Sequence, residues 1–290
     1  MSELPAELAA TAAGLGLRIT RVVRRTDKTL LADGTLAGRR VAVKCLIHSD
    51  PFWVAKLRHE AHAYQVFADS PPPVRVPQLA YTDNSRLLIL EWLDGRNLDD
   101  DRYPQRSLTA EEAEAALGCV LALGRWAAPA GAFEAIFGYP GRFRRYHASG
   151  HLSGPDLAAL DRLLARTGPP SRVNHGDPLP SNILLRAGGS AALLDWEFTG
   201  LFLAGFDLAM LHTLLGARTP TIKTRIDETI ADAGDEDAFA VNLVAVIVRE
   251  LRIHQELPEE PLRGSRLPLI EAAWQQARER LHGLAARRPR

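Results

Sequence analysis

The chain has 290 residues, of which 46% are hydrophobic, and it carries 35 basic and 35 acidic residues, so that its formal net charge is zero. This length and hydrophobic content allow one large domain or two lobes with a sizeable core, and a chain without net positive charge offers no global basic field to hold nucleic acid. The two cysteines, Cys45 and Cys119, match neither a disulfide framework nor a paired metal-binding spacing.

Two segments bear on the location of the protein. The N-terminal residues MSELPAELAATAAGLG lack the basic region of a signal peptide. The later apolar run AFAVNLVAVIV is too short to cross a bilayer and is followed directly by Arg249 and Glu250. We therefore expect a soluble, cytoplasmic protein with no membrane partner, whose oligomeric state the sequence does not define.

The N-terminal third of the chain is rich in β-branched residues and turn residues. Within residues 18–46, LRITRVV and RVAVKCL are expected to be strands, with turn chemistry supplied by ADGTLAG between them. Asp50 and Pro51 predict an N-cap and the first position of a helix that continues to about Ala68. Two more strands are expected in PQLAYT and RLLILEW, around the turn DNS.

The pattern becomes helical after Asp94-Gly95. Thr109 and Glu112 form a predicted capping box at the start of one helix. Helical periodicity then recurs in six segments, 140–148, 155–166, 205–216, 220–232, 236–256 and 267–286. The sequence thus predicts an α+β chain with a strand-rich part followed by a helical part.

The segment VNHGDPLPSNILLRAGGSAALLDWEFTG, residues 173–200, carries polar residues at both ends of two short apolar runs. If NILLR and AALLDW form a hairpin about Gly188-Gly189, Asn182 and Asp195 face each other across the ladder, with Cβ atoms ~5 Å apart. An amide and a carboxylate at that separation can bind Mg²⁺, which prefers oxygen ligands. An ordinary hairpin with polar ends explains the pattern equally well when it is taken alone.

Asp177 lies five residues before Asn182, in the pattern H-x-D-x-x-x-x-N. Phosphoryl transfer uses a carboxylate that accepts the proton of the attacking hydroxyl and metal ligands that neutralise charge on the phosphates. Asp177 suits the first role, and Asn182 and Asp195 suit the second. His175 is expected to orient the loop by hydrogen bonding, because no other histidine lies nearby in the sequence.

Lys44 and Glu60 are each anomalous alone. Alternation within VAVKCL makes Lys44 point from a strand that should be largely buried. Glu60 is the charged member of an apolar helical stripe that also contains Trp53, Leu57 and Tyr64. Because a buried, unpaired carboxylate costs several kcal/mol, an ion pair explains both residues and would hold the lysine against nucleotide phosphates. The alternative is a lysine that extends to solvent and a glutamate at the wet edge of the stripe.

Together these motifs resemble the protein-kinase-like fold, and most closely the aminoglycoside phosphotransferase family, over nearly the whole chain. VAVK resembles the family's strand-lysine motif, HGDPLPSN its catalytic loop, LLDWEFTG its metal-binding aspartate segment and GFDLAML its following D-L-A element. The resemblance implies two lobes. Residues 1–94 would form a nucleotide-binding lobe with an antiparallel sheet and one helix, and residues 95–290 a larger helical lobe with the catalytic loop and the substrate site.

The resemblance also implies roles for individual residues. Asp177 would be the catalytic base, and Asn182 and Asp195 would bind Mg²⁺. Lys44 would bind a phosphate of ATP, with GTP as the alternative nucleotide, and Glu60 would position Lys44.

Three further roles follow from the segments around these motifs. LEWLDG resembles the hinge between the lobes, where the backbone of Glu91 and Leu93 would hydrogen-bond adenine and Ala42 would lie above the ring. Asp207 resembles the buried aspartate that braces the catalytic loop. Asp207 also opens a predicted helix, where an acidic residue is favourable, and both explanations can hold.

Two departures from the family pattern narrow the function. The nucleotide loop RRTDKTLL contains no glycine, unlike the G-x-G-x-x-G loop of protein kinases, and its Thr26, Lys28 and Thr29 are better explained as solvated turn residues than as phosphate ligands. The segment between Asp195 and Phe206 is too short for an activation loop, which favours a small molecule with a hydroxyl group over a protein substrate.

The acceptor itself is open. Acidic residues at 99–101 and 259–260 could attract a cationic aminoglycoside, although a solvated acidic loop is the favoured explanation. Nearby basic residues suit a neutral or anionic molecule equally; these are Arg102, Arg142, Arg144 and Arg145.

The expected function is transfer of the γ-phosphoryl group of ATP to a hydroxyl of a small molecule, with an aminoglycoside or another antibiotic as one candidate. The alternatives are a metabolite kinase, acting on a sugar or an amino-alcohol, and a pseudokinase scaffold that binds nucleotide without catalysis. A pseudokinase usually lacks the lysine, the base or a metal ligand, and this chain has all of them, which favours the enzyme.

Overall fold

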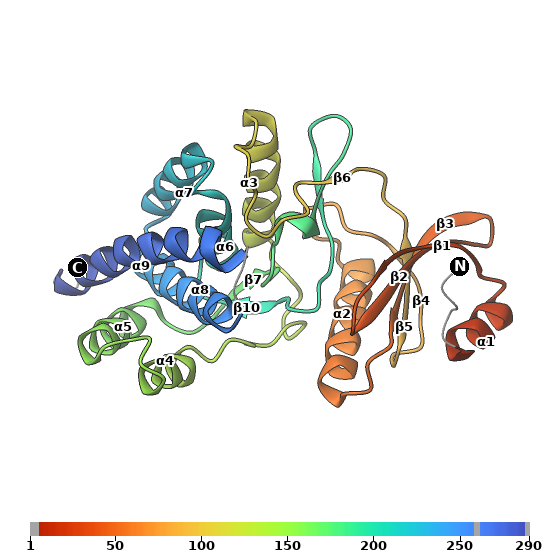
Figure 1. Ribbon diagram of the computed structural model, residues 1–290, viewed down its shortest axis with the longest axis horizontal. Helices are drawn as coiled ribbons and strands as arrows, with labels where there is room; N and C mark the ends of the chain where they lie inside the picture. Colours follow the sequence, from red (N-terminus) through yellow and green to blue (C-terminus); the bar gives the residue numbers. More distant parts are fainter. Residues whose placement is uncertain (1–5, 258–261, 288–290) are drawn as a thin grey trace.

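The computed structural model of the protein describes residues 6–257 and 262–287. An N-terminal sheet lies at one end of the molecule and most helices gather at the other (Figure 1). This arrangement confirms the predicted α+β organisation, an antiparallel sheet followed by a helical region. Glu259 and Glu260, considered above as an attraction for a cationic acceptor, lie outside the described residues.

The N-terminal sheet is antiparallel and has five strands in the order β1-β2-β3-β5-β4. Val41, Val43 and Cys45 alternate along the third strand and fill the apolar layer on one face of the sheet, which leaves Lys44 on the other face. The strands are β1 (Arg18–Arg25), β2 (Thr29–Leu36), β3 (Arg39–Leu46), β4 (Leu79–Thr82) and β5 (Leu87–Glu91).

The turn between β2 and β3 occupies only the end of ADGTLAG, the segment expected to turn, and most of that segment belongs to β2, a strand that was not predicted. Asp33 and Gly34, expected in the turn, are inside β2, and the chain reverses at Ala37 and Gly38, whose φ angles are 48° and 77°. Asp33 is buried in the strand because Arg40 donates to it from Nη2 at 2.7 Å and from Nε at 3.1 Å. Asp33, which the sequence pattern placed in a turn, is therefore held in the sheet by an ion pair with Arg40 that forms only when β2 and β3 pair.

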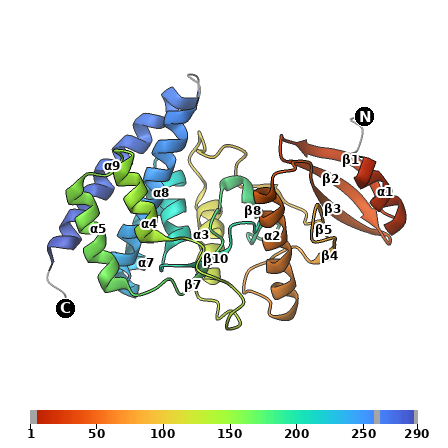
Figure 2. The ribbon, with the colours of Figure 1, turned by 90° about the horizontal axis from the view of Figure 1, so that it is seen from below.

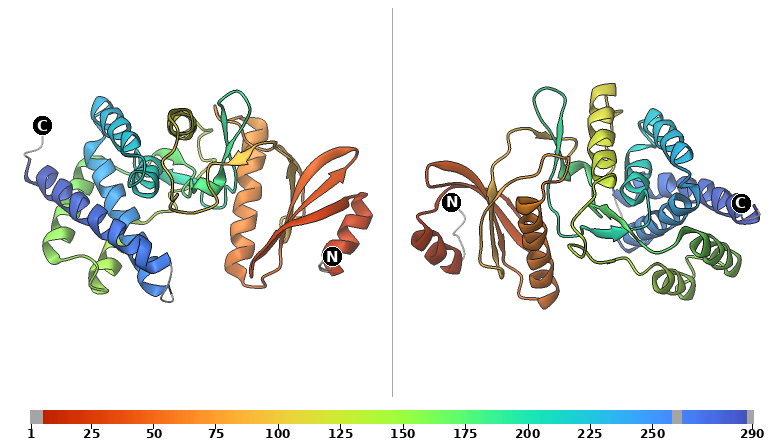
Figure 3. Two further views of the ribbon diagram at one scale, coloured as in Figure 1. Left: turned by 45° about the horizontal axis from the view of Figure 1, so that its top comes forward. Right: turned by 180° about the vertical axis from the view of Figure 1, so that it is seen from behind.

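Two helices cover the sheet, one on each face (Figure 3). The helix α1 (Ala6–Leu15) was not predicted, and it adds Ala12 to the apolar layer against β3. The helix α2 (Pro51–Asp69) begins where Asp50 and Pro51 indicated, with Asp50 Oδ1 accepting from the N–H of Phe52 at 2.8 Å. The expectation of one helix in the N-terminal part is therefore corrected to two.

Seven helices occupy the described part of the C-terminal region, and each was predicted. Five of them, α4 to α8, begin and end within about two residues of the expected positions, and the capping box of Thr109 and Glu112 is present at the start of α3. None of the helices that the structure describes is both long and apolar enough to cross a membrane. The helices are α3 (Ala110–Gly124), α4 (Tyr139–Ala148), α5 (Gly154–Thr167), α6 (Phe206–Leu215), α7 (Pro220–Ala233), α8 (Glu236–Glu256) and α9 (Leu262–Ala286).

Two small sheets connect the N-terminal sheet to the helices. The predicted hairpin forms β8 (Ile183–Leu185) and β9 (Ala191–Leu193), and β6 (Arg96–Asn97) adds a short antiparallel edge to it. A second pair, β7 (Arg172–Asn174) with β10 (Gly200–Phe202), was not expected. The pair β7–β10 thus flanks the polar segment 173–200, and the hairpin β8–β9 lies within it.

The helix α2 lies between the N-terminal sheet and the rest of the chain (Figure 2). Tyr64 and Phe67 of this helix belong to the same apolar cluster as the C-terminal helices. The ring of Phe67 lies 4.6 Å from that of Trp196, which is fully buried and lies 4.7 Å from the ring of His175. These contacts pack α2 directly against the segment that carries the candidate active site. The division of the chain into lobes at residue 94 stays a prediction.

Candidate active site

The hairpin β8–β9 has a register one residue away from the predicted one. Ile183, Leu184 and Leu185 pair with Leu193, Ala192 and Ala191, so that Asn182 lies opposite Leu194 and not opposite Asp195.

The turn explains the shift. The N–H of Arg186 donates to the carbonyl of Ser190 at 2.9 Å, which leaves three residues in the turn instead of two. Gly188 and Gly189 both take positive φ angles, 81° and 75°. Direct opposition of Asn182 and Asp195 was therefore wrong. The N–H of Leu194, the residue before Asp195, donates to the Asn182 carbonyl at 2.9 Å.

Lys44 is the centre of a cluster of carboxylates. Its Nζ donates to Glu60 Oε2 and to Asp195 Oδ1, at 2.6 Å in both cases. The predicted ion pair of Lys44 with Glu60 is therefore present, and Glu60 is only 1% exposed. The Asp195 side chain, by contrast, is 40% exposed, so this end of the cluster is open to a ligand.

Glu197 is a member of the cluster to which the sequence analysis gave no role. Its Oε2 lies 3.8 Å from Lys44 Nζ, and carboxylate oxygens of Glu60, Asp195 and Glu197 lie within 4.8 Å of one another. The sequence did hold a signal for Glu197, which is its position two residues after Asp195. A turn in the chain at Asp195 can bring both carboxylates to the same side, near Lys44. The turn is visible in the backbone of Asp195, whose φ is 67°.

Burial and mutual repulsion shape the charge of this cluster. Burial raises the pKa of Glu60 to about 7 against the opposing effect of Lys44, and burial and Asp195 together raise the pKa of Glu197. Burial also raises the pKa of Asp195, but Lys44 outweighs it and keeps that pKa below its ordinary value. Three carboxyl groups thus share one ammonium group, an arrangement that added positive charge would stabilise.

The start of the segment HGDPLPSN is held by Asp207 at the start of α6. One oxygen of Asp207 accepts from the N–H of His175 at 2.6 Å and the other from the N–H of Gly176 at 2.9 Å. Burial raises the pKa of Asp207 to about 7, against these two donors, which lower it. Gly176 has a φ of 83°, and a Cβ there would lie 2.1 Å from the carbonyl oxygen of Phe198. The path of the loop thus depends on the Asp207 carboxylate and on glycine at position 176, where a side chain would not fit.

The ring of His175 is fully buried and makes two hydrogen bonds, one within the loop and one outside it. Its Nδ1 accepts from the N–H of Asp177 at 3.3 Å, so Nε2 carries the proton and donates to the carbonyl of Leu194 at 2.9 Å. Burial lowers the pKa of His175, which favours this neutral form. The ring therefore connects the loop before Asp177 to the strand end before Asp195.

Asp177 and Asn182 lie on the same loop. The Asn182 Nδ2 donates to the carbonyl of Asp177 at 3.0 Å, which leaves its Oδ1 as the atom that could bind a cation. The short helix η1 (Pro180–Asn182) between them contains one of the two prolines of the loop. The backbone thus holds the candidate base Asp177 and the amide of Asn182 in a fixed relation.

Arg249 of α8 lies beside Asp177 and was not predicted as a site residue. Its Nη2 is 3.4 Å from Asp177 Oδ1 and 2.9 Å from the sulfur of Met210. The neighbouring Glu250 is fully buried and is held by Arg102, whose Nε and Nη2 donate to it at 2.8 and 2.6 Å. Arg249 and Asp177 are 72 positions apart in the chain, and no local pattern indicated their contact.

The predicted hinge residues lie at the end of β5. The N–H of Glu91 already donates to the carbonyl of Gln78 at 2.8 Å, so an adenine ring could use only the carbonyl of Glu91. Ala42 pairs with Leu90 across the β3–β5 ladder and lies on the same face of the sheet as Lys44. Leu93 follows β5 directly.

The loop between β1 and β2 is closed on itself. The hydroxyl of Thr26 accepts from the N–H of Lys28 at 3.2 Å and of Thr29 at 3.0 Å, and the Lys28 ammonium group lies 3.8 Å above the ring of Trp53. These donors are therefore not directed at a ligand, in agreement with the prediction that they are turn residues.

Arg24, before this loop, faces the cluster. It pairs with Leu31 across β1–β2, and Leu31 pairs with Lys44 across β2–β3, so Arg24 and Lys44 share one face of the sheet. Arg24 is exposed and close enough to Asp195 to lower the pKa of that carboxyl.

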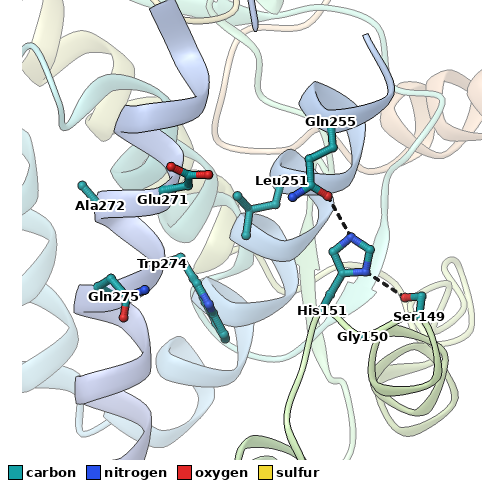
Figure 4. A pocket seen from close by; sticks show the side chains of 9 residues that line it. All are labelled: Ser149, Gly150, His151, Leu251, Gln255, Glu271, Ala272, Trp274 and Gln275. Carbon is teal, nitrogen blue, oxygen red and sulfur yellow. Dashed lines mark hydrogen bonds between the residues drawn. The ribbon is translucent and has the colours of Figure 1, made fainter. Parts of the chain in front are cut away.

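A pocket of about 620 Å³ lies elsewhere, between α8, α9 and the turn that follows α4 (Figure 4). His151 lies at its edge and bonds to Ser149 at 2.8 Å and to Gln255 at 3.1 Å. This pocket shares no residue with the predicted site, so it does not mark the place of phosphoryl transfer. Its lining residues are Ser149, Gly150, His151, Leu251, Gln255, Glu271, Ala272, Trp274 and Gln275.

The fold is similar to those of solved aminoglycoside phosphotransferases. A thermostable mutant of APH(4)-Ia, in a ternary complex with ADP and hygromycin B, matches with a TM-score of 0.58 and 12% identity over 97% of this chain and 98% of that one. The spectinomycin phosphotransferase APH(9)-Ia, in complex with ADP and spectinomycin, matches with a TM-score of 0.56 and 12% identity over 97% and 98%. The GDP and kanamycin complex of APH(2")-IIia matches with a TM-score of 0.59 and 13% identity over 96% and 99%. These matches confirm the protein-kinase-like fold.

The sequence itself gives the family. No curated protein matches it, but a model of the phosphotransferase enzyme family matches residues 20–242. This range contains Lys44, Asp177 and Asp195 together with the elements that bring them into one site. The chain therefore belongs to the phosphotransferase enzyme family.

Proposed function

We propose that the protein transfers the γ-phosphoryl group of ATP to a hydroxyl group of a small molecule. The observation that carries this proposal is the contact of Lys44 Nζ with both Glu60 and Asp195, at 2.6 Å each. It joins a strand lysine to a carboxylate 151 positions later in the chain. A lysine so held can meet phosphate oxygens beside the carboxylate that would hold their metal ion.

The donor set fits Mg²⁺, which takes oxygen ligands in a near-octahedral arrangement and keeps several waters. Asp195 would bind the ion through its exposed carboxylate, Asn182 through Oδ1, and Glu197 as a third oxygen donor. When bound with nucleotide, Mg²⁺ neutralises charge on the phosphates. Lys44 would bind phosphate, Ala42 and the backbone of Glu91 and Leu93 would hold the base, and ATP and GTP both remain candidates.

Asp177 would act on the acceptor. The acceptor oxygen attacks the γ-phosphorus, its proton passes to Asp177, and the bond from the γ-phosphorus to the bridging oxygen breaks, with its electron pair left on ADP. His175 and Asp207 would orient the loop and would not touch the reacting atoms. The products are ADP and the phosphorylated acceptor.

A small acceptor is favoured over a protein. Only ten residues separate Asp195 from Phe206 at the start of α6, and β10 occupies part of that segment. No length remains there for a loop that could present a peptide or respond to phosphorylation. An aminoglycoside or other antibiotic and a metabolite such as a sugar or amino-alcohol are the acceptor classes to compare.

The proposed function is tested with ATP, Mg²⁺ and a panel of hydroxylated antibiotics and metabolites, with ADP formation as the measurement. We expect acceptor-dependent ADP formation by the wild type. Asp177→Asn, which keeps shape but cannot take the proton, should bind Mg²⁺-nucleotide nearly as well and lose about 10²–10⁴-fold in turnover.

Two results would contradict the proposal. Full phosphotransfer by Asp177→Asn would remove the assigned role of the base. Nucleotide binding without transfer to any member of a wide panel would favour the scaffold alternative and would contradict the proposed enzyme activity.

A further inference from the structure

We infer that the acceptor is an anion, a hydroxylated molecule whose carboxylate or phosphate group is bound by Arg249. This inference rests on the proposed function, because it takes Asp177 as the group that meets the acceptor hydroxyl. The observation that starts it is a guanidinium group 3.4 Å from the Asp177 carboxylate.

Arg249 lacks strong partners of its own. Its distance to Asp177 is long for a charged hydrogen bond, and its other Nη2 contact, at 2.9 Å, is to the thioether of Met210, a weak acceptor. Its Nε is buried and has no hydrogen-bond acceptor within the described part of the chain. A guanidinium group has five N–H donors in a planar fork, so most of this fork is available to a further acceptor.

The adjacent carboxylate does not satisfy this fork. Glu250 lies 3.4 Å from Arg249 Nε, but both of its oxygens accept shorter hydrogen bonds from Arg102, at 2.6 and 2.8 Å. Tyr103 donates a third bond to it at 3.2 Å. The charge of Glu250 is therefore matched by Arg102, and Arg249 keeps a positive charge that faces the base.

The place of Arg249 favours the acceptor over the nucleotide. Its described partners, Asp177, Met210 and Glu250, all belong to the C-terminal region. The phosphate-binding candidate Lys44 contacts Glu60, Asp195 and Glu197 instead, and the two sets share no residue. We therefore assign the nucleotide phosphates to the side of Lys44 and the hydroxyl compound to the side of Arg249.

The guanidinium group of Arg249 favours an acceptor that carries negative charge. Carboxylates and phosphates match the planar fork of arginine with two parallel hydrogen bonds. A polycation such as an aminoglycoside would place ammonium groups beside an arginine that no described carboxylate fully pairs. An anionic group would also draw the guanidinium away from Asp177, whose oxygen is then free to accept the hydroxyl proton.

The test uses sets of acceptors that share a carbon skeleton and differ in one terminal group, which is anionic, neutral or cationic. One set is glucuronate, glucose and 6-amino-6-deoxyglucose, with glucose 6-phosphate as the phosphate arm. A second set is glycerate, glycerol and 3-amino-1,2-propanediol, and a wider group adds other hydroxy acids, sugar phosphates and kanamycin. ADP formation gives kcat/KM for each compound, and binding of Mg²⁺·ADP is measured separately. A preference for the carboxylate or for the phosphate member distinguishes the two anionic groups.

We expect an anionic compound to give the highest kcat/KM. Arg249→Gln should then raise KM for that compound by about 10- to 100-fold, the loss expected for a charge-assisted contact, with a smaller effect on kcat and none on Mg²⁺·ADP binding. Arg249→Lys, which keeps the charge without the fork, should restore part of the loss and guards against a folding defect. Arg252→Gln, one turn later on α8 and paired with Glu256 at 3.8 Å, is the matched control and should resemble the wild type.

Three results would overturn the inference: preference for the neutral or cationic members, failure to phosphorylate any anionic compound, or a loss of Mg²⁺·ADP affinity in Arg249→Gln in place of the effect on KM. These results differ from failure of the proposed function. In that case the wild type would bind nucleotide without transfer to any compound, or would not bind Mg²⁺-nucleotide at all.

Discussion

Lys44 and Glu60 differ in how directly each would meet a nucleotide. Lys44 would touch phosphate, whereas Glu60 would act through Lys44. We expect Lys44→Ala to weaken Mg²⁺·ATP binding by about 10- to 100-fold, the loss of a charge-assisted hydrogen bond, and Glu60→Ala to weaken it less. Titration calorimetry on both variants measures this order. A larger effect from Glu60→Ala would mean that Lys44 is not the phosphate ligand.

The pKa of Glu60 predicts a pH-dependent contribution to stability. Burial raises this pKa from the ordinary 4.5 to about 7, so between these values the folded protein holds a proton that the unfolded chain releases. The contribution of Glu60 is therefore present below pH 4.5 and is lost as pH rises toward 7, with a slope of at most about 1.4 kcal/mol per pH unit.

The measurement compares wild type with Glu60→Gln in urea unfolding between pH 5 and 7.5. As pH rises, the free energy of unfolding of the wild type should fall relative to that of Glu60→Gln. Subtracting the variant is necessary because buried histidines such as His175 and His212, whose pKa values are lowered, change the total stability in the opposite direction over part of this range. A difference that stays constant would show that Glu60 is ionised throughout.

At the scale of elements, β1 and its loop provide the next prediction. The loop amides bond to Thr26, so they cannot surround phosphates as a glycine-rich loop does, and Arg24 shares the face of Lys44. We expect Arg24→Ala to weaken binding of Mg²⁺·ATP by about 10-fold or more and to leave binding of adenosine unchanged.

Arg25→Ala is the matched control for this prediction. Arg25 is the next residue of β1, is also exposed, and pairs with the buried Leu30 on the opposite face of the sheet. Its removal should leave ATP affinity unchanged. Equal losses in the two variants would indicate a general electrostatic effect of the arginine-rich strand, and no loss in Arg24→Ala would contradict a phosphate contact.

The elements that the sequence predicted are those with local signals. Asp50 and Pro51 define the start of α2, and Thr109 and Glu112 that of α3, because each cap bonds within its own first turn. The strands β6, β7 and β10 have two or three residues each, and their existence depends on partners distant in the chain. No periodicity develops over such lengths, and these elements could not be predicted.

The same distinction applies to the candidate site. Lys44 and Glu60 were paired correctly because each was an anomaly within its own element. The register of β8–β9 was missed by one residue because Gly188-Gly189 suits both a two-residue and a three-residue turn. Arg249 was missed because its neighbour Asp177 lies on a loop 72 positions earlier, and only the packing of α8 against that loop joins them.

At the scale of the whole molecule, the contact between Lys44 and Asp195 connects the N-terminal sheet to the end of the hairpin. Because three carboxyl groups surround one lysine there, we expect Mg²⁺·ADP to stabilise the protein as a whole. At 100 times its dissociation constant, a ligand that binds only the folded state adds ~2.7 kcal/mol to the free energy of unfolding.

Scanning calorimetry with Mg²⁺·ADP, and with ADP and EDTA, separates the contribution of the metal. Asp195→Asn keeps the side-chain shape and suits the left-handed backbone, since asparagine tolerates a positive φ. This variant should lose the part of the stabilisation that depends on Mg²⁺. Equal stabilisation of the wild type with and without EDTA would contradict a metal site at Asp195.

The burial of Trp196 between Phe67 and His175 also has an optical consequence. Trp196 is one of five tryptophans, and its indole lies between Phe67 of α2 and His175, the residue that begins the segment HGDPLPSN. A protein in which Trp53, Trp92, Trp126 and Trp274 are replaced by phenylalanine would emit from this position alone, at the short wavelengths of an apolar surrounding. The chain thus carries its own fluorophore at the junction of its two regions, and the intensity of that emission would report any movement there when a nucleotide is added.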